Sequence, residues 1–153
     1  MTAAPPDDLT LRPAEATETA AVLALYRDAG LDRQTLPLDR ARALFDEIQA
    51  RPDRELRVAV DPSGTVVGSY LLAVVVKLGH LGTPFAVVDD VAVAPDRQGQ
   101  GVGTALMRDA ITRARAHGCY KLALSSNLAR EGAHRFYQKL GFHQHGVSFE
   151  VAV

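Results

Sequence analysis

The chain of 153 residues lacks most of what a metal or redox site needs, since it has a single cysteine, Cys119. One cysteine excludes an internal disulfide and a metal site built from several thiolates. Cys119 lies at the junction of an expected helix and an expected strand, and we interpret it as a packed thiol, not a nucleophile. The five histidines form neither H-x-x-x-H nor H-E-x-x-H, and the pair His143 and His145 is a weak metal signal. No metal site is therefore predicted.

An excess of one charge is also absent, because the formal net charge is −1, and only 6% of the residues are aromatic. There is no run of basic residues, which argues against nucleic acid as the main partner. No apolar run reaches membrane-spanning length, and the N-terminus lacks the basic segment and apolar core of a secretory signal. We therefore expect a cytoplasmic protein without a membrane partner.

The residues that are present are typical of one globular domain, with 47% hydrophobic and 23% charged residues. Residues 1–8 are expected to be a disordered lead-in, followed by a single domain over residues 9–153. Hydrophobic periodicity, with glycine and proline as breaks, predicts strands over residues 9–12, 56–60, 65–76, 85–94, 120–125 and 147–153, and helices over residues 14–29, 38–50, 101–117 and 131–140. This order predicts an α/β fold with a mixed sheet and helices on both faces. Gly68, inside the long third strand, predicts a bulge.

The chain is organised around residues 91–108, which read as a buried strand, a glycine-rich turn and the start of a helix. Pro95 ends the strand because proline has no N–H for the ladder. Gly99, Gly101 and Gly103 follow at every second position, and glycine lets a ligand approach the backbone closely. The open N–H groups of the first helical turn, with the helix dipole, predict an anion site, most naturally for phosphate. A turn without a ligand is the alternative.

The turn departs from two common phosphate-binding patterns. No Gly-Lys-Ser/Thr follows the glycines, and Thr104 stands where G-x-G-x-x-G needs its last glycine. It does match Q/R-x-x-G-x-G/A, as Gln98-x-x-Gly101-x-Gly103, and in this the chain resembles the GNAT superfamily of N-acetyltransferases. The resemblance covers residues 9–153. It implies a GNAT-like fold, with a mostly antiparallel sheet splayed in the middle, and acetyl-coenzyme A (acetyl-CoA) as the cosubstrate.

The resemblance also implies where the coenzyme binds. The amides of the turn would hold its diphosphate, and the backbone of the preceding strand would pair with its pantetheine arm. Asn127 would hydrogen-bond the same arm, although an ordinary loop start explains this asparagine equally well. The implied coenzyme-binding residues are Val91, Ala92, Val93, Gln98, Gly99, Gln100, Gly101, Val102, Gly103, Thr104, Asn127 and Tyr137.

Tyr137 belongs to the stretch A-H-R-F-Y-Q-K-L-G-F over residues 133–142, which is similar to the family's closing motif F-Y-x-x-x-G-F. Phe136 and Leu140 share a helix face and are interpreted as core. The resemblance places the phenol of Tyr137 near the sulfur of the coenzyme. A phenol with an ordinary pKa of about 10 can donate a proton to a leaving thiolate at neutral pH. A role in packing alone is the alternative.

Asp89 and Asp90 form a carboxylate pair inside a run of valines. Adjacent strand residues point to opposite faces, so one of the two is expected to line the cleft where the sheet splays. A carboxylate there can receive the ammonium of the acceptor and take its proton, directly or through a water. A solvated pair or a salt bridge is the alternative, and a bulge would change which residue faces the cleft. An N–H near Val91 is a candidate oxyanion donor.

Two subgroups of the superfamily share further residues with the chain. L-S-S-N and R-x-x-A-H-R-F-Y, within residues 124–137, resemble aminoalkylphosphonate N-acetyltransferases. G-C-Y-K at 118–121 and V-D-D-V-A-V at 88–93 resemble glucosamine-6-phosphate N-acetyltransferases, although those enzymes have an acidic base where this chain has Ser125. Both subgroups acetylate small primary amines that carry a phosphorus oxyanion. Candidates to bind such a group, which a solvated helix face explains equally well, are Arg130, His134 and Arg135.

We therefore predict an N-acetyltransferase that moves an acetyl group from acetyl-CoA to a primary amine, by direct attack in a ternary complex. The loops 31–37 and 77–84 are expected to form the acceptor site, with His80, Asp90, Arg130 and His134 as candidate substrate residues. Two alternatives remain, which are a non-catalytic acyl-CoA-binding module and a protein or peptide N-acetyltransferase. A homodimer paired through the apolar last strand, F-E-V-A-V, is a further expectation.

Overall fold

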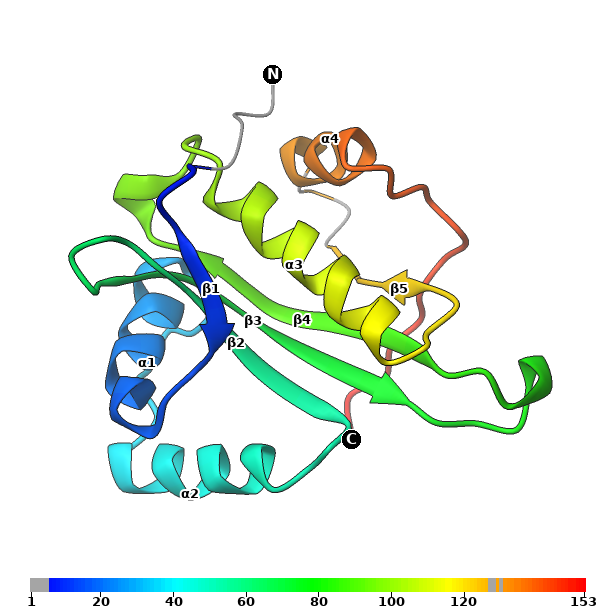
Figure 1. Cartoon of the computed structure of the whole chain (residues 1–153), viewed down its shortest axis with the longest axis horizontal. Helices are drawn as coiled ribbons and strands as arrows, with labels where there is room; N and C mark the ends of the chain where they lie inside the picture. Colours follow the sequence, from blue (N-terminus) through cyan, green and yellow to red (C-terminus); the bar gives the residue numbers. More distant parts are fainter. Residues whose placement is uncertain (1–5, 127–128, 130) are drawn as a thin grey trace.

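The computed structural model describes residues 6–126, 129 and 131–153. It is a five-stranded sheet in the order β1-β2-β3-β4-β5, with helices on both faces (Figure 1). Neighbouring strands are antiparallel except β4 and β5, which are parallel. The strands are β1 (Thr10–Pro13), β2 (Arg54–Val60), β3 (Val66–Val75), β4 (Phe85–Val93) and β5 (Leu122–Ala123), and the α-helices are α1 (Thr19–Asp28), α2 (Leu38–Gln49), α3 (Val102–Ala116) and α4 (Glu131–Lys139). The predicted mixed, mostly antiparallel sheet is confirmed.

The core is divided between the two faces of the sheet because successive side chains of a strand point to opposite sides. Val58 and Val60 of β2 pack with Val22 of α1 and Phe45 of α2. Ala59, between them, belongs to the larger cluster under α3. The sheet is therefore the middle layer, with α1 and α2 on one side and α3 on the other (Figure 1).

α3 packs directly on β3 because Gly68 has no side chain. A Cβ at Gly68 would lie 2.8 Å from Val102 Cγ1 and 3.0 Å from Leu106 Cδ1. The register between β2 and β3 shifts opposite this glycine, between Ala59 and Val60, so the predicted bulge is confirmed. The close approach fixes the first turns of α3 on the sheet.

A buried ionic network also holds α3 in place. Arg57 of β2 is 7% exposed, and its Nε donates to Asp109 Oδ2 at 2.9 Å. The Tyr70 hydroxyl of β3 donates to the same carboxylate oxygen at 2.7 Å. A buried charge without a partner is strongly destabilising, so these mutual contacts favour one position of α3 along the sheet.

Two predicted strands differ from the structure. The strand predicted over residues 120–125 is reduced to the two residues of β5. The strand predicted over residues 147–153 is wrong, because this segment forms no strand. Its apolar side chains lie in solvent, with Val147, Phe149 and Val151 at 73%, 91% and 82% exposed. Alternation suits a half-buried strand, but the strand forms only beside a partner edge, and no described strand pairs with this segment.

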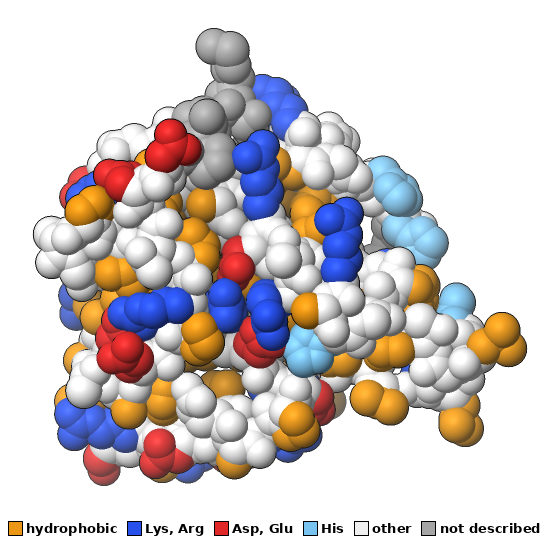
Figure 2. Space-filling view, in the orientation of Figure 1, with side chains coloured by type: hydrophobic (Ala, Val, Ile, Leu, Met, Phe, Trp, Pro, Cys, Tyr) orange, Lys and Arg blue, Asp and Glu red, His pale blue; other side chains and the backbone are white. Residues whose placement is uncertain are grey.

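The β3–β4 hairpin projects from the rest of the molecule, and its tip is apolar. Leu78 and Leu81 are 97% and 102% exposed, and Figure 2 shows hydrophobic side chains gathered at this projection. Within the described ranges, no helix has the length and apolar composition that crossing a membrane requires. Of the predicted lead-in, residues 1–5 lie outside the described part, and residues 7 and 8 form a turn before β1.

Candidate active site

The sheet opens where β4 and β5 part. Pairing between these parallel strands ends at Val87 and Ala123, while β4 continues to Val93. The edge of residues 88–93 that faces β5 therefore has no strand partner in the described chain. An extended ligand can bind such an edge as an added strand would, through backbone N–H and C=O groups. This opening is the predicted splay, and it contains the predicted coenzyme residues Val91, Ala92 and Val93.

Unpaired amides gather at the turn between β4 and α3. After a 3₁₀ turn (Pro95–Arg97), α3 begins behind Gly101, whose φ of +88° lies in the left-handed region that glycine adopts easily. Over the described residues, no backbone acceptor receives the N–H groups of Gly99, Gly101, Val102, Gly103 and Thr104. Free N–H groups and the positive end of a 15-residue helix form an anion site. The turn therefore has the donors that a diphosphate requires.

The turn is anchored to the connection between β2 and β3. Arg97 Nη2 donates to Asp61 Oδ2 at 2.6 Å. The Ser63 hydroxyl also donates to Asp61, and this hydrogen bond is the main reason why the pKa of Asp61 lies below its usual value. Gln98 and Gln100 are exposed beside the glycines, and Gln100 Nε2 donates to a carbonyl oxygen four residues earlier at 2.8 Å. These contacts tie the turn to the β2–β3 connection and support its own backbone.

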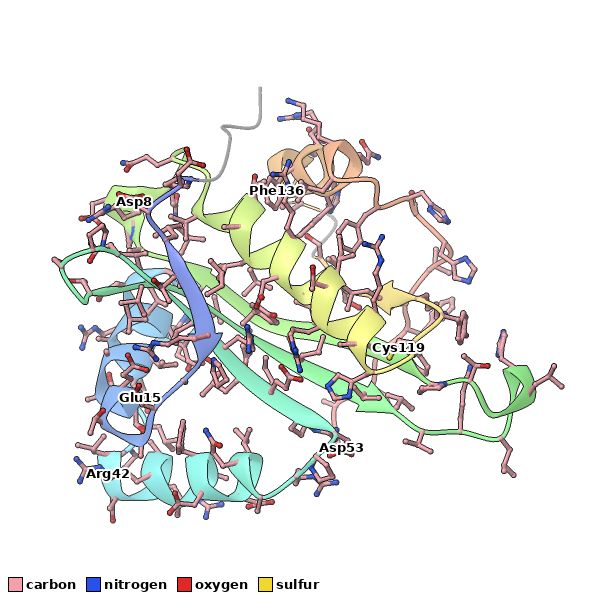
Figure 3. All side chains as sticks on the ribbon, in the orientation of Figure 1. Asp8, Glu15, Arg42, Asp53, Cys119 and Phe136 are labelled. Atoms are coloured by element: carbon pink, nitrogen blue, oxygen red, sulfur yellow. The ribbon has the colours of Figure 1, made fainter. Side chains whose placement is uncertain are left out.

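α4 covers the first turn of α3. A Cβ on Gly103 would come within 3.3 Å of Phe136 Cζ, and Figure 3 shows Phe136 between the two helices. The half-buried ring of Tyr137 lies 5.2 Å from that of Phe136 and 5.7 Å from that of Phe142, between centroids. Phe136 and Leu140 pack against the main core, which confirms their interpretation as core residues. Tyr137 therefore belongs to the helix that covers the glycine turn.

Asp89 and Asp90 lie in a bulge of β4. Ser69 pairs with Ala92 and Leu71 pairs with Asp89, so β4 has one residue more than β3 over this segment. Asp90 has a φ of +49°, and its N–H donates to Asp89 Oδ1 at 2.9 Å. A bulge interrupts the alternation of faces and re-aims side chains. The alternation of faces on which the expectation for this pair rested is therefore interrupted at these two residues.

The charges of both carboxylates affect pKa values on the face of the sheet that α1 covers. Burial raises the pKa of Asp90, and the negative charges of Asp89 and Asp32 raise it further. Burial also raises the pKa of Tyr26 in α1, and the charges of Asp90, Asp32 and Asp89 add to this shift. A carboxylate with a raised pKa is a better proton acceptor near neutral pH. Asp89 accepts the bulge N–H, whereas no described hydrogen bond occupies the Asp90 carboxylate.

Sequence reasoning missed Tyr26 and Ser69 in this region. Ser69 is fully buried, and its Oγ has no hydrogen-bond partner in the described structure. Asp32 falls in the loop 31–37 that was expected at the acceptor site, and its N–H donates to the carbonyl oxygen of Tyr26 at 3.4 Å. Tyr26 and Ser69 have the sequence pattern of ordinary core positions. Ser69 lies at the bulge because β3 pairs with β4 there, and Tyr26 reaches it because α1 packs on these two strands.

Of the remaining candidate substrate residues, the structure describes His80 and His134, and it places them in the β3–β4 hairpin and in α4. His80 is exposed in the β3–β4 hairpin, where its ring stacks on Tyr120 at 4.5 Å and its Nδ1 lies 2.9 Å from Lys77 Nζ. This hairpin tip is at the opposite end of β4 from the glycine turn (Figure 1). His134 is half-buried in α4. Asn127 and Arg130 lie outside the described residues.

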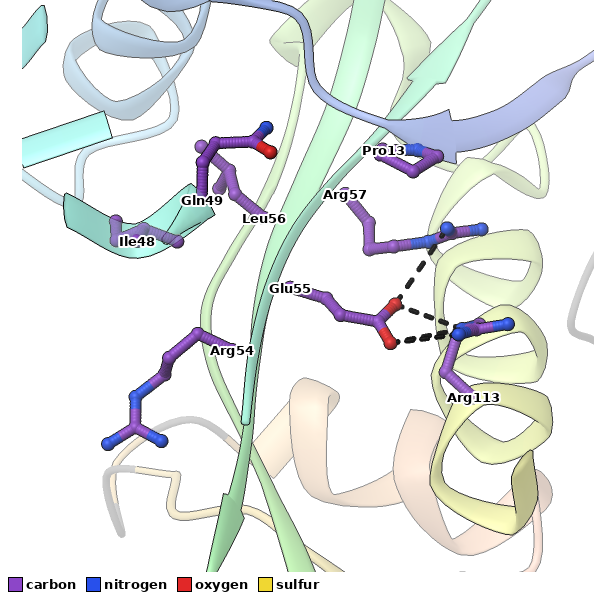
Figure 4. A pocket seen from close by; sticks show the side chains of 8 residues that line it. All are labelled: Pro13, Ile48, Gln49, Arg54, Glu55, Leu56, Arg57 and Arg113. Carbon is purple, nitrogen blue, oxygen red and sulfur yellow. Dashed lines mark hydrogen bonds and ion pairs between the residues drawn. The ribbon is translucent and has the colours of Figure 1, made fainter. Parts of the chain in front are cut away.

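A hollow lies between β2, the end of α2 and α3, and the charged side chains that line it form ion pairs with one another (Figure 4). Glu55 accepts hydrogen bonds from Arg113 Nε at 2.9 Å and from His117 Nε2 at 2.6 Å. Burial would raise the pKa of Glu55, but these contacts together lower it below the usual value. Because its charges are engaged in fixing α3 to β2, we interpret this hollow as structural.

Comparison with known sequences agrees with this geometry. The model of the acetyltransferase (GNAT) family matches residues 20–142. An aminoalkylphosphonate N-acetyltransferase from Salmonella typhimurium is 32% identical over 146 residues, which cover 94% of this chain and 90% of that protein. A glucosamine 6-phosphate N-acetyltransferase from Trypanosoma brucei brucei is 39% identical over 84 residues, and this match spans about half of each protein, 55%.

The fold is similar to that of solved structures as well. One from Agrobacterium tumefaciens, described as an acetyltransferase, superposes with a TM-score of 0.88 at 28% identity and covers 94% of this chain and 99% of its own. The family match spans the glycine turn, the bulge and α4, which are the elements of the candidate site. The resemblance inferred from Gln98-x-x-Gly101-x-Gly103 is thereby confirmed. The chain belongs to the acetyltransferase (GNAT) family, and it is an acyltransferase.

Proposed function

We propose that this protein transfers the acetyl group of acetyl-CoA to the primary amine of a small molecule, by direct attack in a ternary complex. The observation that carries the proposal is the combination of an unpaired β4 edge with the unpaired amides of the following turn. The unpaired edge ends at Val93, and the unpaired amides of the turn begin six residues later at Gly99. This arrangement suits a ligand with an extended arm and a diphosphate at its end.

On the donor side, residues of this chain would bind acetyl-CoA and orient its thioester. The N–H groups of Gly99, Gly101, Val102, Gly103 and Thr104 would hold the diphosphate, and Gln98 and Gln100 border it. The backbone of Val91, Ala92 and Val93 would pair with the pantetheine arm. Ser126, just after β5, has a buried Oγ without a hydrogen-bond partner among the described residues, which supports a polar ligand in this gap. Acetyl-CoA supplies the activated acetyl thioester.

On the acceptor side, Asp90 would act as the general base. Its raised pKa and unoccupied carboxylate suit it to take the proton of the substrate ammonium. Asp89 instead would hold the bulge, because it accepts the N–H of Asp90. The neutral amine forms a bond to the carbonyl carbon, while an N–H near Val91 would stabilise the negative charge that develops on the carbonyl oxygen.

Tyr137 would assist the departing thiolate. The carbon–sulfur bond breaks as the amide forms, and the electron pair leaves on sulfur. A phenol O–H within hydrogen-bond reach can donate a proton to that sulfur, and the proton that the attacking nitrogen loses as the amide forms would restore the phenol. The place of Tyr137 on α4, which covers the glycine turn, supports this role.

The test is thiol release from acetyl-CoA with a panel of acceptors: aminoalkylphosphonates, amino sugars and their phosphates, aminoglycosides, diamines, amino acids and short peptides. Turnover on a small amine supports the proposal. Turnover on peptides alone would favour a protein acetyltransferase. Coenzyme binding, measured by calorimetry, without any turnover would favour a non-catalytic acyl-CoA-binding module. Absence of coenzyme binding would contradict the assignment of the glycine turn.

A further inference from the structure

The tip of the β3–β4 hairpin presents aliphatic side chains to solvent at the end of a projection. Val76, Leu78 and Leu81 are 79%, 97% and 102% exposed, whereas Leu36 and Leu38, which also lie at the surface, are 37% exposed. Figure 2 shows the hydrophobic side chains gathered at this end of the molecule. Exposed apolar side chains that gather in one place mark a site of interaction with a protein or a membrane.

The backbone of the tip holds these leucines outward. His80, Leu81 and Gly82 have successive positive φ values of 54°, 56° and 76°. This region is unfavourable for residues with a side chain, and it persists only where surrounding contacts support it. Here the N–H of Gly82 donates to the carbonyl oxygen of Leu78 at 3.1 Å, and the ring of His80 stacks on Tyr120 at 4.5 Å. The exposure of Leu81 is therefore built into the hairpin.

Two lysines stand at the base of the tip. Their Nζ atoms lie over the same two aromatic rings, with Lys77 at 4.9 Å and Lys121 at 5.2 Å from the centroid of Phe85. The corresponding distances to Tyr120 are 5.0 and 5.6 Å, and Lys77 Nζ also donates to the Tyr120 hydroxyl at 3.0 Å. No carboxylate of the described chain forms an ion pair with either lysine. The base of the tip is therefore positively charged.

The composition of the two segments strengthens this charge. Residues 62–88 and 110–130, which contain the hairpin and the lead into β5, have no aspartate or glutamate. The complement of such a surface is an anionic one. Aliphatic side chains are outermost, with an aromatic ring and lysines behind them, and this is the order in which a bilayer offers hydrocarbon and then phosphate headgroups. Protein interfaces take most of their binding energy from tryptophan, tyrosine and arginine, whereas leucine and valine form this tip.

We propose that the tip of the β3–β4 hairpin binds the surface of an anionic membrane, with Leu78 and Leu81 among the acyl chains and Lys77 and Lys121 at the lipid phosphates. Such a contact requires no membrane-spanning helix. The inference goes beyond the proposed function and does not depend on it. The glycine turn lies at the opposite end of β4, so it would remain in water while the tip is bound (Figure 1).

The first test uses fluorescence, because the chain contains no tryptophan. Leu78→Trp places a single fluorophore at the tip, and Leu36→Trp places one at a surface position away from it. Each variant is mixed with vesicles of phosphatidylcholine, with and without phosphatidylserine. The emission of Leu78→Trp should shift to shorter wavelength only with phosphatidylserine, and added salt should reduce the shift. The emission of Leu36→Trp should stay unchanged. An unchanged spectrum of Leu78→Trp, or an equal shift with both kinds of vesicle, would overturn the inference.

The second test measures affinity by co-sedimentation with the phosphatidylserine vesicles. Lys77→Gln should weaken binding by about fivefold, because a lysine near an anionic surface contributes this much. Lys139→Gln removes an exposed charge on α4 and is the matched control, which should bind as the wild type does. Leu81→Ser should weaken binding by about tenfold or more. Denaturant unfolding checks that each variant is folded.

Equal losses in Lys77→Gln and Lys139→Gln would mean that general charge attracts the protein, and would overturn the role of the tip. A second copy of the chain is the competing occupant. If light scattering shows a dimer that Leu81→Ser converts to a monomer, and the wild type does not sediment with the vesicles, the tip is a contact between copies and the membrane proposal fails.

Discussion

At the scale of single residues, the neighbouring carboxylates Asp89 and Asp90 have different contacts and different environments. Asp89 and Asp90 are identical in chemistry and adjacent in sequence, but the left-handed φ of Asp90 separates their environments. Asp89 accepts the backbone N–H that closes the bulge, and Asp90 carries the raised pKa. The sequence left the choice between the two open, because it contains no signal for the bulge.

Asp90→Asn should lower kcat by about 100-fold or more, since positioned acid–base groups contribute 10²–10⁴-fold. In the wild type, kcat/KM should rise with pH as the Asp90 carboxyl loses its proton, at a pH above the usual range for aspartate because its pKa is raised. The variant should lose this acidic limb. Asp89→Asn is the matched control and should keep most of the rate, with the acidic limb moved to lower pH because the charge of Asp89 no longer raises the pKa of Asp90. A pH–rate profile that is the same in Asp90→Asn and wild type would remove Asp90 from proton transfer.

Tyr137→Phe should lower turnover by about 100-fold while the affinity for acetyl-CoA stays close to that of the wild type, because only the proton donor is removed. The ring would still pack against Phe136 and Phe142, so folding should be kept. Single-turnover kinetics and calorimetry with acetyl-CoA separate the two effects. Unchanged turnover would mean that Tyr137 is only a packing residue.

At the scale of elements, the glycine turn would act through its backbone N–H groups and not through side chains. The Q-x-x-G-x-G pattern identifies it in the sequence because the glycines themselves are the signal. The reason why each glycine is needed comes from the fold. Gly101 supplies a φ of +88° before α3, and Gly103 leaves room for Phe136 of α4. The second requirement joins residues 33 positions apart and cannot be read from the local pattern.

Gly101→Glu should abolish coenzyme binding, because it places bulk and negative charge at the diphosphate position. A side chain at this left-handed φ also costs about 1–2 kcal/mol of stability. Gly101→Ala is therefore the control, since it has the same strain without the charge. Denaturant unfolding should show similar losses for both variants, while calorimetry should show weak binding for alanine and none for glutamate. Wild-type affinity in Gly101→Glu would place the diphosphate elsewhere.

At the scale of the whole molecule, the exposed C-terminal segment is the feature that the monomer does not explain. Val147, Phe149, Val151 and Val153 alternate with polar or small residues and lie in solvent. An apolar stripe of this kind in extended chain is suited to pairing with a sheet edge. We expect a second copy of the chain to cover it, as the sequence pattern of the segment predicts.

Light scattering should then give a mass twice that of the chain. Phe149→Lys should shift the protein toward the monomer, because burying a phenylalanine side chain contributes about 1.5–3 kcal/mol. Ser148→Lys adds the same charge on the other side of the segment and should leave the dimer intact. A wild-type protein that is monomeric at all accessible concentrations would contradict the expectation.

The sequence by itself determined the order of strands and helices from β1 to α4, the family and the glycine turn. These features are local, since hydrophobic period, breaker residues and short motifs act within a few positions. Tertiary structure decided the features that depend on long-range contacts. The bulge at Asp90 arises where β4 pairs with β3, and this pairing places Ser69 beside it. Tyr26 and Asp32 reach it only because α1 packs on those strands. The last strand was mispredicted for the same reason, because alternation is local whereas a strand exists only beside a partner.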